Sequence, residues 1–175
     1  KGAIYPEIPL VAWASRRIGR PVKWRCERSE GFVADDHARD NVSDVEFALG
    51  EEGEFLALKV KTNANLGAYL AFLGAAAPTV NIGGFVGVYT TKALHVEVTG
   101  VLTNTSPLSP YRGAGRPEAS YILERMIDIA ASRLGIDPTE LRRRNLIPSD
   151  AMPYKTPLIF TYDCGEFEIV MDKAL

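Results

Sequence analysis

Hydrophobic residues along this chain follow two periods, one typical of helices and one typical of strands. From Pro6 to Gly19, apolar side chains recur at helical spacing, and Gly19 followed by Pro21 indicates the end of that helix. The next segment, VKWRCER, alternates apolar with charged residues and predicts a half-buried strand with Cys26 on its inward face.

Further strands are predicted in the middle of the chain. The segment DVEFALGEEGEFLALKVKTNANLGAY predicts two strands around a polar turn at Glu51 to Glu54, and KALHVEVTGVLTNT predicts another. Between them, residues 70 to 90 are small, apolar and rich in glycine. This run is too short and too broken to span a membrane, so it predicts a buried loop or a short helix.

The second half of the chain predicts helices. Pro117 suits the first turn of a long helix, and Gly135 suits its end. Asp137 is placed as the N-cap of a second helix (ELRRRNL), and a last helix follows Gly165. A helix, then strands, then helices indicate the α+β class. The apolar face of the long helix consists of Ala119, Ile122, Leu123, Met126, Ile127, Ala130 and Leu134.

Composition narrows the class of function. The 175 residues carry a net charge of −2 and are 46% hydrophobic, which does not favour binding to nucleic acid or to a membrane surface. The two cysteines lie far apart, which favours a reducing compartment such as the cytoplasm, and with two histidines they offer little for a metal site. The chain begins at Lys1 without Met and stops within a helical pattern, so we expect an excerpt of a longer polypeptide.

The segment PYRGAGRPEA carries the strongest signal for chemistry, and its residues 111–116 are called the Gly-Arg loop below. Arg112 and Arg116 flank Gly113 and Gly115 directly before the long helix. A glycine-rich turn at a helix N-terminus leaves backbone N–H groups free to bind an anion or oxo ligand, and guanidiniums add directed donors. The alternative is a tight turn whose arginines pair with surface carboxylates.

Two phosphate-binding motifs fit this loop poorly. The loop supplies only half of G-x-G-x-x-G, and the long helix leads to another helix at Asp137 rather than to a parallel strand, so a dinucleotide-binding βαβ unit is not expected. A P-loop is excluded because no GK[ST] follows.

Other polar residues have ordinary explanations. His37 lies among aspartates (DDHARD), where a solvated loop is favoured over a metal site, and His95 lies on a predicted strand facing solvent. Cys164 lies at a helix start and, like Cys26, has no histidine nearby in sequence that would suggest a nucleophile. The basic run Arg142 to Arg144 predicts a solvated helix face, with docking of a partner subunit as the alternative.

Several segments occur here in the order in which one known family has them. They are YPEIPLVAWASRRIGRPVKWRCERSEGF, YRGAGRPEA, DPTELRRRNL and MPYKTPLIFTYDCGEF. Through them the chain resembles the large, molybdenum-cofactor-binding subunit of the xanthine oxidase family of molybdenum hydroxylases. Within it, the chain is most similar to aerobic-type carbon monoxide dehydrogenase large subunits and their relatives. Lys1 matches the last residue of the family's Gly-Gly-Phe-Gly-x-Lys segment.

The resemblance implies a cofactor, a reaction and partners. Residues 1–175 would be part of a molybdopterin-binding domain that holds a molybdopterin-type molybdenum cofactor, with the cytosine dinucleotide form as one option. The enzyme would hydroxylate a small-molecule substrate, at an aldehyde or N-heterocycle carbon, with water-derived oxygen. Electrons would pass to an iron–sulfur small subunit and an FAD medium subunit. The family's general-base Glu lies beyond this chain, so the chain alone is expected to be inactive.

The resemblance also assigns site residues, nearly all of them in the Gly-Arg loop. Arg112 is expected to be catalytic, by stabilising charge on the substrate or transition state. Arg116 has a carboxylate pair as its alternative role. Tyr154 matches a loop on the substrate side, with an ordinary packed or surface tyrosine as the alternative. The residues expected to contact the cofactor are Tyr111, Gly113, Ala114, Gly115 and Arg116.

Two departures from the family pattern reduce the range of reactions expected for this chain. Carbon monoxide dehydrogenases of the best-defined type carry a copper-binding cysteine in the loop (YRCSFR), where this chain has Gly113. Xanthine-type enzymes carry a substrate-binding Glu after the lysine, where this chain has Gly2. Glu118 belongs to the matched PEA segment and does not replace the missing base. Two alternatives to the hydroxylase are kept. One is carbon monoxide dehydrogenase, which Gly113 opposes, and the other is a non-catalytic assembly module of the same fold.

Overall fold

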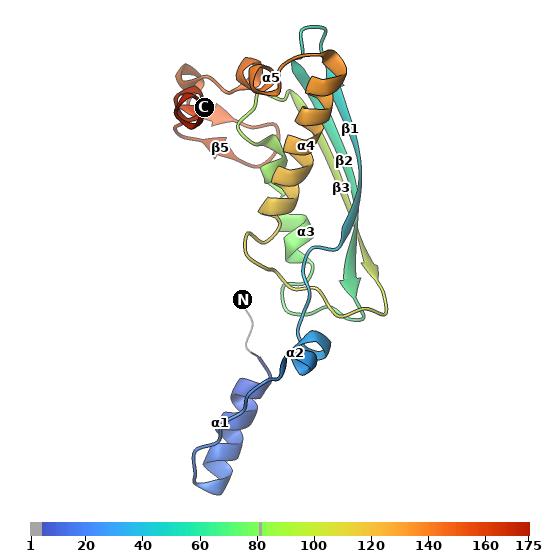
Figure 1. Ribbon diagram of the computed structural model, residues 1–175, viewed down its shortest axis with the longest axis vertical. Coiled ribbons are helices and arrows are strands. Elements are labelled where there is room, and N and C mark those ends of the chain that lie inside the picture. Colours follow the sequence, from blue (N-terminus) through green and yellow to red (C-terminus); the bar gives the residue numbers. More distant parts are fainter. Residues whose placement is uncertain (1–4, 81) are drawn as a thin grey trace.

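The computed structural model describes residues 5–80 and 82–175, which form an elongated body with an N-terminal arm (Figure 1). The arm contains α1 (Glu7–Ile18) and α2 (Arg28–Ala34), and neither helix has a buried residue. The helix predicted from Pro6 to Gly19 is confirmed, because α1 ends at Gly19 with a left-handed φ of 66°. Lys1, which matches the end of the family's Gly-Gly-Phe-Gly-x-Lys segment, and Gly2, which replaces the substrate-binding Glu of xanthine-type enzymes, lie outside the described residues.

The strand predicted for VKWRCER is wrong. Residues 21–27 pair with no strand in the described part of the chain, and α2 begins directly afterwards at Arg28. The side chain of Trp24 is 43% exposed. Alternation produces a strand only where a neighbouring strand completes the backbone hydrogen bonds, and none lies alongside here. Cys26 is consequently a half-buried residue of the arm, next to Gly31, and not a core residue.

The body is built on a three-stranded sheet of order β1-β2-β3. β1 (Asn41–Leu49) and β2 (Phe55–Gly67) are the two strands predicted around the polar turn and pair antiparallel, and β3 (Ala93–Leu102) pairs in parallel with β2. Side chains of β2 alternate between buried and exposed, so the sheet has one core face and one solvent face. The solvent face carries His95, Glu97 and Lys61, with Lys61 Nζ 3.2 Å from the Glu97 carboxylate.

The long helix α4 (Arg116–Leu134) covers the core face of the sheet (Figure 1). It begins with Pro117 in its first turn and ends at Gly135, as predicted. The crossover from β2 to β3 contains α3 (Ala76–Val80) and the short 3-10 helix η1 (Ile82–Val86), and η1 packs against α4. The core between these elements consists of Phe55, Leu58, Val60, Phe85, Tyr89, Ala119, Leu123, Ile127, Ala130, Ala131 and Leu141.

The crossover is only partly buried. Phe85 and Val86 lie in the core, as predicted for a buried loop or short helix in residues 70 to 90. Leu70 and Phe72, at its start, are 61% and 64% exposed. Among the described residues, no helix is long and apolar enough to cross a bilayer.

The C-terminal part packs beside α4. α5 (Pro138–Asn145) is preceded by its N-cap Asp137, whose carboxylate accepts hydrogen bonds from the N–H groups of Thr139 and Glu140 at 2.9 and 3.0 Å, so the predicted N-cap is confirmed. The 3-10 helix η2 (Ser149–Ala151), a small sheet of β4 (Tyr154–Lys155) and β5 (Thr161–Tyr162), and α6 (Phe167–Ala174) follow.

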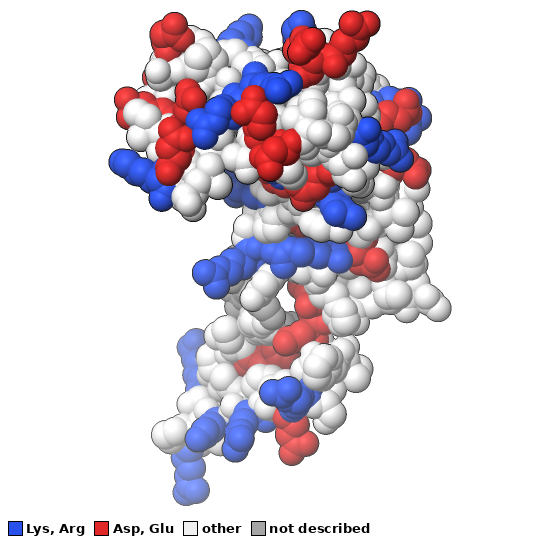
Figure 2. Space-filling model, turned by 45° about the horizontal axis from the view of Figure 1, so that its top comes forward, with Lys and Arg blue, Asp and Glu red and all other residues white. Residues whose placement is uncertain are grey.

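The basic run of α5 connects elements of the chain itself. Each arginine of this run pairs with a carboxylate at 2.6 to 2.9 Å, so this partly exposed face carries charges that are paired within the chain. Figure 2 shows the resulting mixture of basic and acidic side chains over this end of the body. The pairs are Arg142 with Glu124 and Asp128, Arg143 with Glu168 and Asp172, and Arg144 with Glu140.

Candidate functional site

The Gly-Arg loop leads from β3 into the N-terminus of α4 (Figure 1). Gly113, Ala114 and Gly115 have successive positive φ angles of 94°, 47° and 99°. Residues with a β-carbon adopt this region rarely, which explains the two glycines. Backbone bonds from Ala114 N–H to Tyr111 O (2.7 Å) and from Arg116 N–H to Gly113 O (3.0 Å) close the turn. The loop is therefore a defined turn.

Four backbone donors of this loop have no hydrogen-bond partner among the described residues. They are the N–H groups of Tyr111, Arg112, Gly113 and Gly115, of which the last two lie in the positive-φ turn, whereas the N–H groups of Ala114 and Arg116 are used inside the turn. Gly115 is buried and occupies the N-cap position of α4 without a side-chain cap. Buried N–H groups are nearly always paired, and a helix N-terminus attracts negative charge. The turn thus suits an anionic or oxo ligand.

The steric environment explains why position 113 has no side chain. A β-carbon at Gly113 would lie 2.5 Å from Cδ of Pro117, well inside van der Waals contact. The ring of Pro117 therefore requires glycine at position 113, and the backbone of Gly113 stays exposed at the surface of the loop. These residues therefore fit a cofactor that presents oxygen or sulfur ligands to backbone donors.

The arginines of the loop point to the same chemistry. Arg112 and Arg116 are exposed, and neither guanidinium has an ion pair with a described residue. The alternative of a turn whose arginines pair with surface carboxylates therefore has no support in the described contacts. Tyr111 is 55% exposed, so its ring is also accessible beside the two guanidiniums.

Sequence reasoning missed Arg39, which contacts the Gly-Arg loop. Its guanidinium lies 5.0 Å from the ring centroid of Tyr111 and donates a hydrogen bond to the backbone carbonyl of Arg112. Its Nε lies 3.7 Å from a carboxylate oxygen of Glu118. Arg39 is 73 residues from Arg112 in the chain, and no motif marks it. The only sequence feature that sets Arg39 apart from other surface arginines is its position in the polar DDHARD segment.

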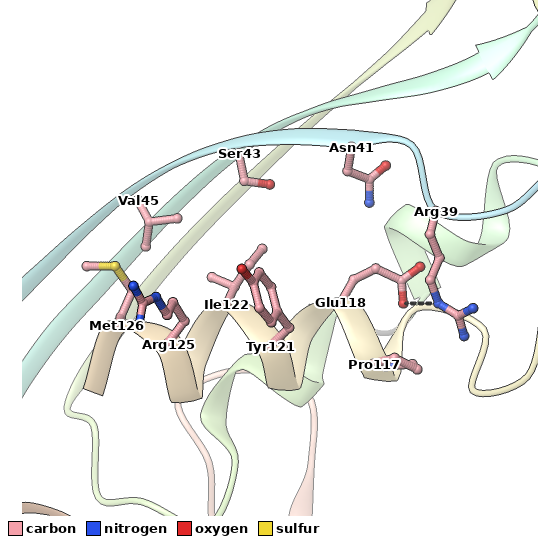
Figure 3. A pocket seen from close by; sticks show the side chains of 10 residues that line it. All are labelled: Arg39, Asn41, Ser43, Val45, Pro117, Glu118, Tyr121, Ile122, Arg125 and Met126. Atoms are coloured by element: carbon pink, nitrogen blue, oxygen red, sulfur yellow. Dashed lines mark ion pairs between the residues drawn. The ribbon is translucent and has the colours of Figure 1, made fainter. Parts of the chain in front are cut away.

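A groove extends from the loop along α4 (Figure 3). It has a volume of about 530 Å³ and lies between the edge strand β1 and α4. Arg39 and Glu118 lie at one end of it and Met126 at the other, with Tyr121 and Arg125 between them (Figure 3). The groove brings polar and apolar side chains together immediately beside the start of α4.

Tyr154 lies in another part of the molecule. It pairs with Tyr162 across the β4–β5 hairpin, and the hydroxyl of Tyr162 donates to Gly87 O at 2.7 Å. Burial, followed by the charge of Tyr154, raises the pKa of Tyr162 above its usual value. No described contact joins Tyr154 to the Gly-Arg loop.

The remaining candidates form no site of their own. In the described part of the chain, no three His, Cys, Asp or Glu side chains come together as a metal site. His37 is exposed, and its backbone joins the segment before the loop through His37 N–H to Pro107 O and Ser109 N–H to His37 O. His95 faces solvent as predicted, with its side chain 64% exposed.

The topology around the loop excludes the dinucleotide-binding alternative. α4 is followed by α5, and the next strand, β4, belongs to a separate two-stranded sheet. No parallel strand therefore follows α4 in the described chain, as a βαβ unit requires.

The structure is an α+β domain in which the Gly-Arg loop places backbone N–H groups without described partners at the N-terminus of α4. Residues 1–146 match the family model of the molybdopterin cofactor-binding domain, and the chain belongs to that family. The resemblance to the large subunits of the xanthine oxidase family is therefore confirmed, together with the expected α+β fold.

Individual relatives agree with this assignment. The chain is 37% identical to the carbon monoxide dehydrogenase large chain of Hydrogenophaga pseudoflava, covering 100% of this chain and 22% of that protein. It is 34% identical to the 6-hydroxypseudooxynicotine dehydrogenase complex subunit gamma of Paenarthrobacter nicotinovorans, covering 96% and 21%. The structure of quinoline 2-oxidoreductase from Pseudomonas putida 86 superposes with a TM-score of 0.89 at 33% identity, covering 97% and 22%. The chain thus spans about a fifth of the length of these relatives.

Proposed function

We propose that residues 1–175 are part of the large subunit of a molybdenum hydroxylase and that the Gly-Arg loop forms one wall of its active site. The observation that carries the proposal is the backbone of the loop. Its successive positive φ angles leave the N–H groups of Gly113 and Gly115 without described partners, beside two arginines without ion pairs. Membership of the molybdopterin cofactor-binding family supports a molybdenum cofactor as the ligand of these donors.

Five of the six residues of the Gly-Arg loop have a role in this proposal, and the sixth, Ala114, uses its N–H inside the turn. When bound, a molybdopterin-type cofactor, plain or as the cytosine dinucleotide, supplies the redox metal and the water-derived oxygen of hydroxylation. The N–H groups of Gly113 and Gly115 donate to its ligands, and the guanidinium of Arg112 stabilises negative charge that develops on the substrate. Tyr111 and Arg116 line the same wall. Tyr154 reaches the substrate side only if other parts of the protein bring substrate to the β4–β5 hairpin.

The substrate class we favour is an aromatic N-heterocycle. Quinoline 2-oxidoreductase and nicotine 6-hydroxylase large subunit are named for such compounds, and both are similar to most of this chain. Aldehydes are the second class, as in the aldehyde oxidoreductase of Desulfovibrio gigas, which supports the fold alone. Electrons would leave through an iron–sulfur small subunit and an FAD medium subunit, since the relatives include subunits of complexes.

Carbon monoxide oxidation is the second candidate function, because carbon monoxide dehydrogenase large chains are among the relatives. Position 113 opposes it, because glycine has no sulfur to hold copper. The two cysteines do not replace it: Cys26 lies in the N-terminal arm and Cys164 before α6, and no described contact joins either of them to the loop.

The test is metal and pterin analysis of the full-length protein, purified with its partner subunits, followed by assays with N-heterocycles and aldehydes. About one molybdenum and one pterin per large subunit, without copper, would support the hydroxylase. Stoichiometric copper would favour carbon monoxide oxidation and contradict the argument from Gly113. Absence of molybdenum and pterin, in a host that loads other molybdenum enzymes, would favour a non-catalytic assembly module.

A further inference from the structure

One guanidinium connects three groups at the Gly-Arg loop. Arg39 lies over the ring of Tyr111, donates to the carbonyl oxygen of Arg112 and faces the carboxylate of Glu118. The side chain of Arg39 is 33% exposed and that of Glu118 is 18% exposed, so these contacts are partly shielded from water. Contacts of this kind are stronger in such a setting than on an open surface.

The backbone of Arg39 is held in place independently of its side chain. Arg39 has a φ of 61°, in the left-handed region that residues with a β-carbon rarely adopt. The next residue, Asp40, accepts a bond from Asn65 N–H at 2.9 Å through its carbonyl and from Asn65 Nδ2 at 2.7 Å through its carboxylate. Asn65 also bonds Thr103 and Thr105 at 2.7 and 2.8 Å. The segment is thus fixed to the ends of β2 and β3, which aims Arg39 at the loop.

The carbonyl that Arg39 contacts belongs to the peptide unit that contains the N–H of Gly113. In a planar trans peptide, C=O and N–H point in opposite directions. A guanidinium that fixes the Arg112 carbonyl therefore directs the Gly113 N–H away from Arg39. Hydrogen bonding at the carbonyl also polarises the unit and strengthens its N–H as a donor.

We propose that Arg39 is a positioning residue that orients and polarises the Gly113 N–H donor of the Gly-Arg loop. Arg39 itself does not touch the substrate or cofactor in this assignment. Its importance for catalysis rests on the function proposed above, in which the loop donors face the molybdenum cofactor. Its effect on the peptide unit does not depend on that function.

The role of Glu118 must be separated from that of the loop. One oxygen of its carboxylate is buried without a hydrogen-bond partner, and Arg39 is the cation beside it. Removing Arg39 alone would leave a shielded charge unpaired, which destabilises a protein by a mechanism unrelated to the loop. The double variant R39A/E118Q removes the loop contacts without that unpaired charge.

The experiment measures hydrogen exchange of the Ala114 and Arg116 amides, whose hydrogen bonds close the turn, in the full-length complex, for R39A, E118Q and R39A/E118Q. We expect at least about tenfold faster exchange in both variants that lack Arg39, and unchanged exchange in E118Q. Arg143→Ala is the matched control, since Arg143 also pairs with two carboxylates but lies on α5 and does not contact the loop. Wild-type exchange in R39A/E118Q, or equal acceleration in E118Q, would overturn the proposal.

A spectroscopic measurement separates this inference from the proposed function. In a loaded enzyme, the electron paramagnetic resonance spectrum of molybdenum should change in R39A/E118Q and remain that of the wild type in E118Q and Arg143→Ala. A full-length protein without molybdenum would contradict the proposed function, while the exchange experiment would still decide the role of Arg39. If exchange were faster in R39A/E118Q while its molybdenum spectrum stayed unchanged, the claim that Arg39 orients the Gly113 N–H towards the cofactor would be wrong.

Discussion

Gly113 lies directly against the ring of Pro117, so that a β-carbon at Gly113 would be 2.5 Å from Cδ of Pro117. Pro117 lies in the first turn of α4, and Gly113 lies in the turn that precedes the helix. The close packing of these two residues fixes the turn against the helix. It also explains why the backbone of the loop is exposed to a ligand without an intervening side chain.

Replacing Gly113 with alanine tests this relationship. The β-carbon must either displace Pro117 or distort the turn, at a φ of 94° that alanine disfavours by about 1–2 kcal/mol. We expect the full-length protein to retain markedly less molybdenum and pterin, measured after purification. Gly135→Ala is the control, because Gly135 also has a positive φ, of 68°, but open space around it. Equal cofactor content in the two variants would contradict the prediction.

Arg112→Ala is expected to impair catalysis more than cofactor binding. A charged donor aimed at developing negative charge contributes roughly 100- to 1000-fold in rate, so kcat should fall on that order while molybdenum content stays near wild type. Arg133→Ala is the control, since Arg133 is an exposed arginine in the last turn of α4, away from the loop. Steady-state kinetics with an accepted substrate make the comparison. A similar small effect in both variants would remove Arg112 from the catalytic machinery.

Asn145 is expected to be important for stability. It is 2% exposed, and its amide bonds Phe55 N–H, Gly53 O and Leu141 O at 2.8, 3.0 and 2.9 Å, which joins α5 to the start of β2. Asn145→Ala leaves these buried groups unpaired, at a cost on the order of 3 kcal/mol. Thermal unfolding followed by calorimetry should show a clearly lower Tm.

Asn63→Ala provides the comparison for that measurement. Asn63 is an exposed residue of β2 whose side chain has no hydrogen bond to a described residue, so its replacement should leave Tm nearly unchanged. If the two variants had the same Tm, the buried hydrogen bonds of Asn145 would not be a significant source of stability.

Tyr89 predicts a loss of stability at alkaline pH. Burial, followed by the negative charge of Glu124, raises the pKa of the Tyr89 phenol well above its usual value near 10. The folded state keeps this proton to higher pH than the unfolded state does. The contribution of Tyr89 to the free energy of unfolding is therefore fully present below the unfolded pKa. It falls as pH rises above about 10, by up to about 1.4 kcal/mol per pH unit. Calorimetry between pH 8 and pH 11 should show a falling Tm.

Tyr89→Phe tests the source of that pH dependence. The variant loses the hydrogen bond to Glu124 at 2.9 Å and should be less stable at neutral pH, but its Tm should fall less steeply above pH 10. Some slope will remain, because the pKa of Tyr162 is also raised. An identical slope in wild type and Tyr89→Phe would show that another group is responsible.

The sequence predicted the regular elements well where periodicity and end signals agreed. The Asp137 cap and the Gly135 stop delimit α5 and α4 as expected, because these signals act within one helical turn. The strand expected around Trp24 failed, because a strand depends on a neighbour that no local pattern reports. The glycines of the Gly-Arg loop were visible in the sequence because their chemistry is local.

The contacts that support the loop could not be read from the sequence. Arg39 reaches the Arg112 carbonyl across 73 residues, and only the fold places them together. The arginines of α5 are a similar case: their pattern suggested a solvated face, whereas Arg142 and Arg143 bind carboxylates of α4 and α6. Charged residues that act over long sequence separations are identified by tertiary structure, since no periodicity marks their partners.

The most direct test of the central claim is to locate molybdenum in the full-length complex by anomalous diffraction at its absorption edge. We predict that the metal lies beside the Gly-Arg loop, with at least one of its ligands within hydrogen-bond distance of the N–H of Gly113 or Gly115. Molybdenum bound elsewhere, with these two N–H groups paired to protein or facing water, would contradict the assignment of the loop to the active site.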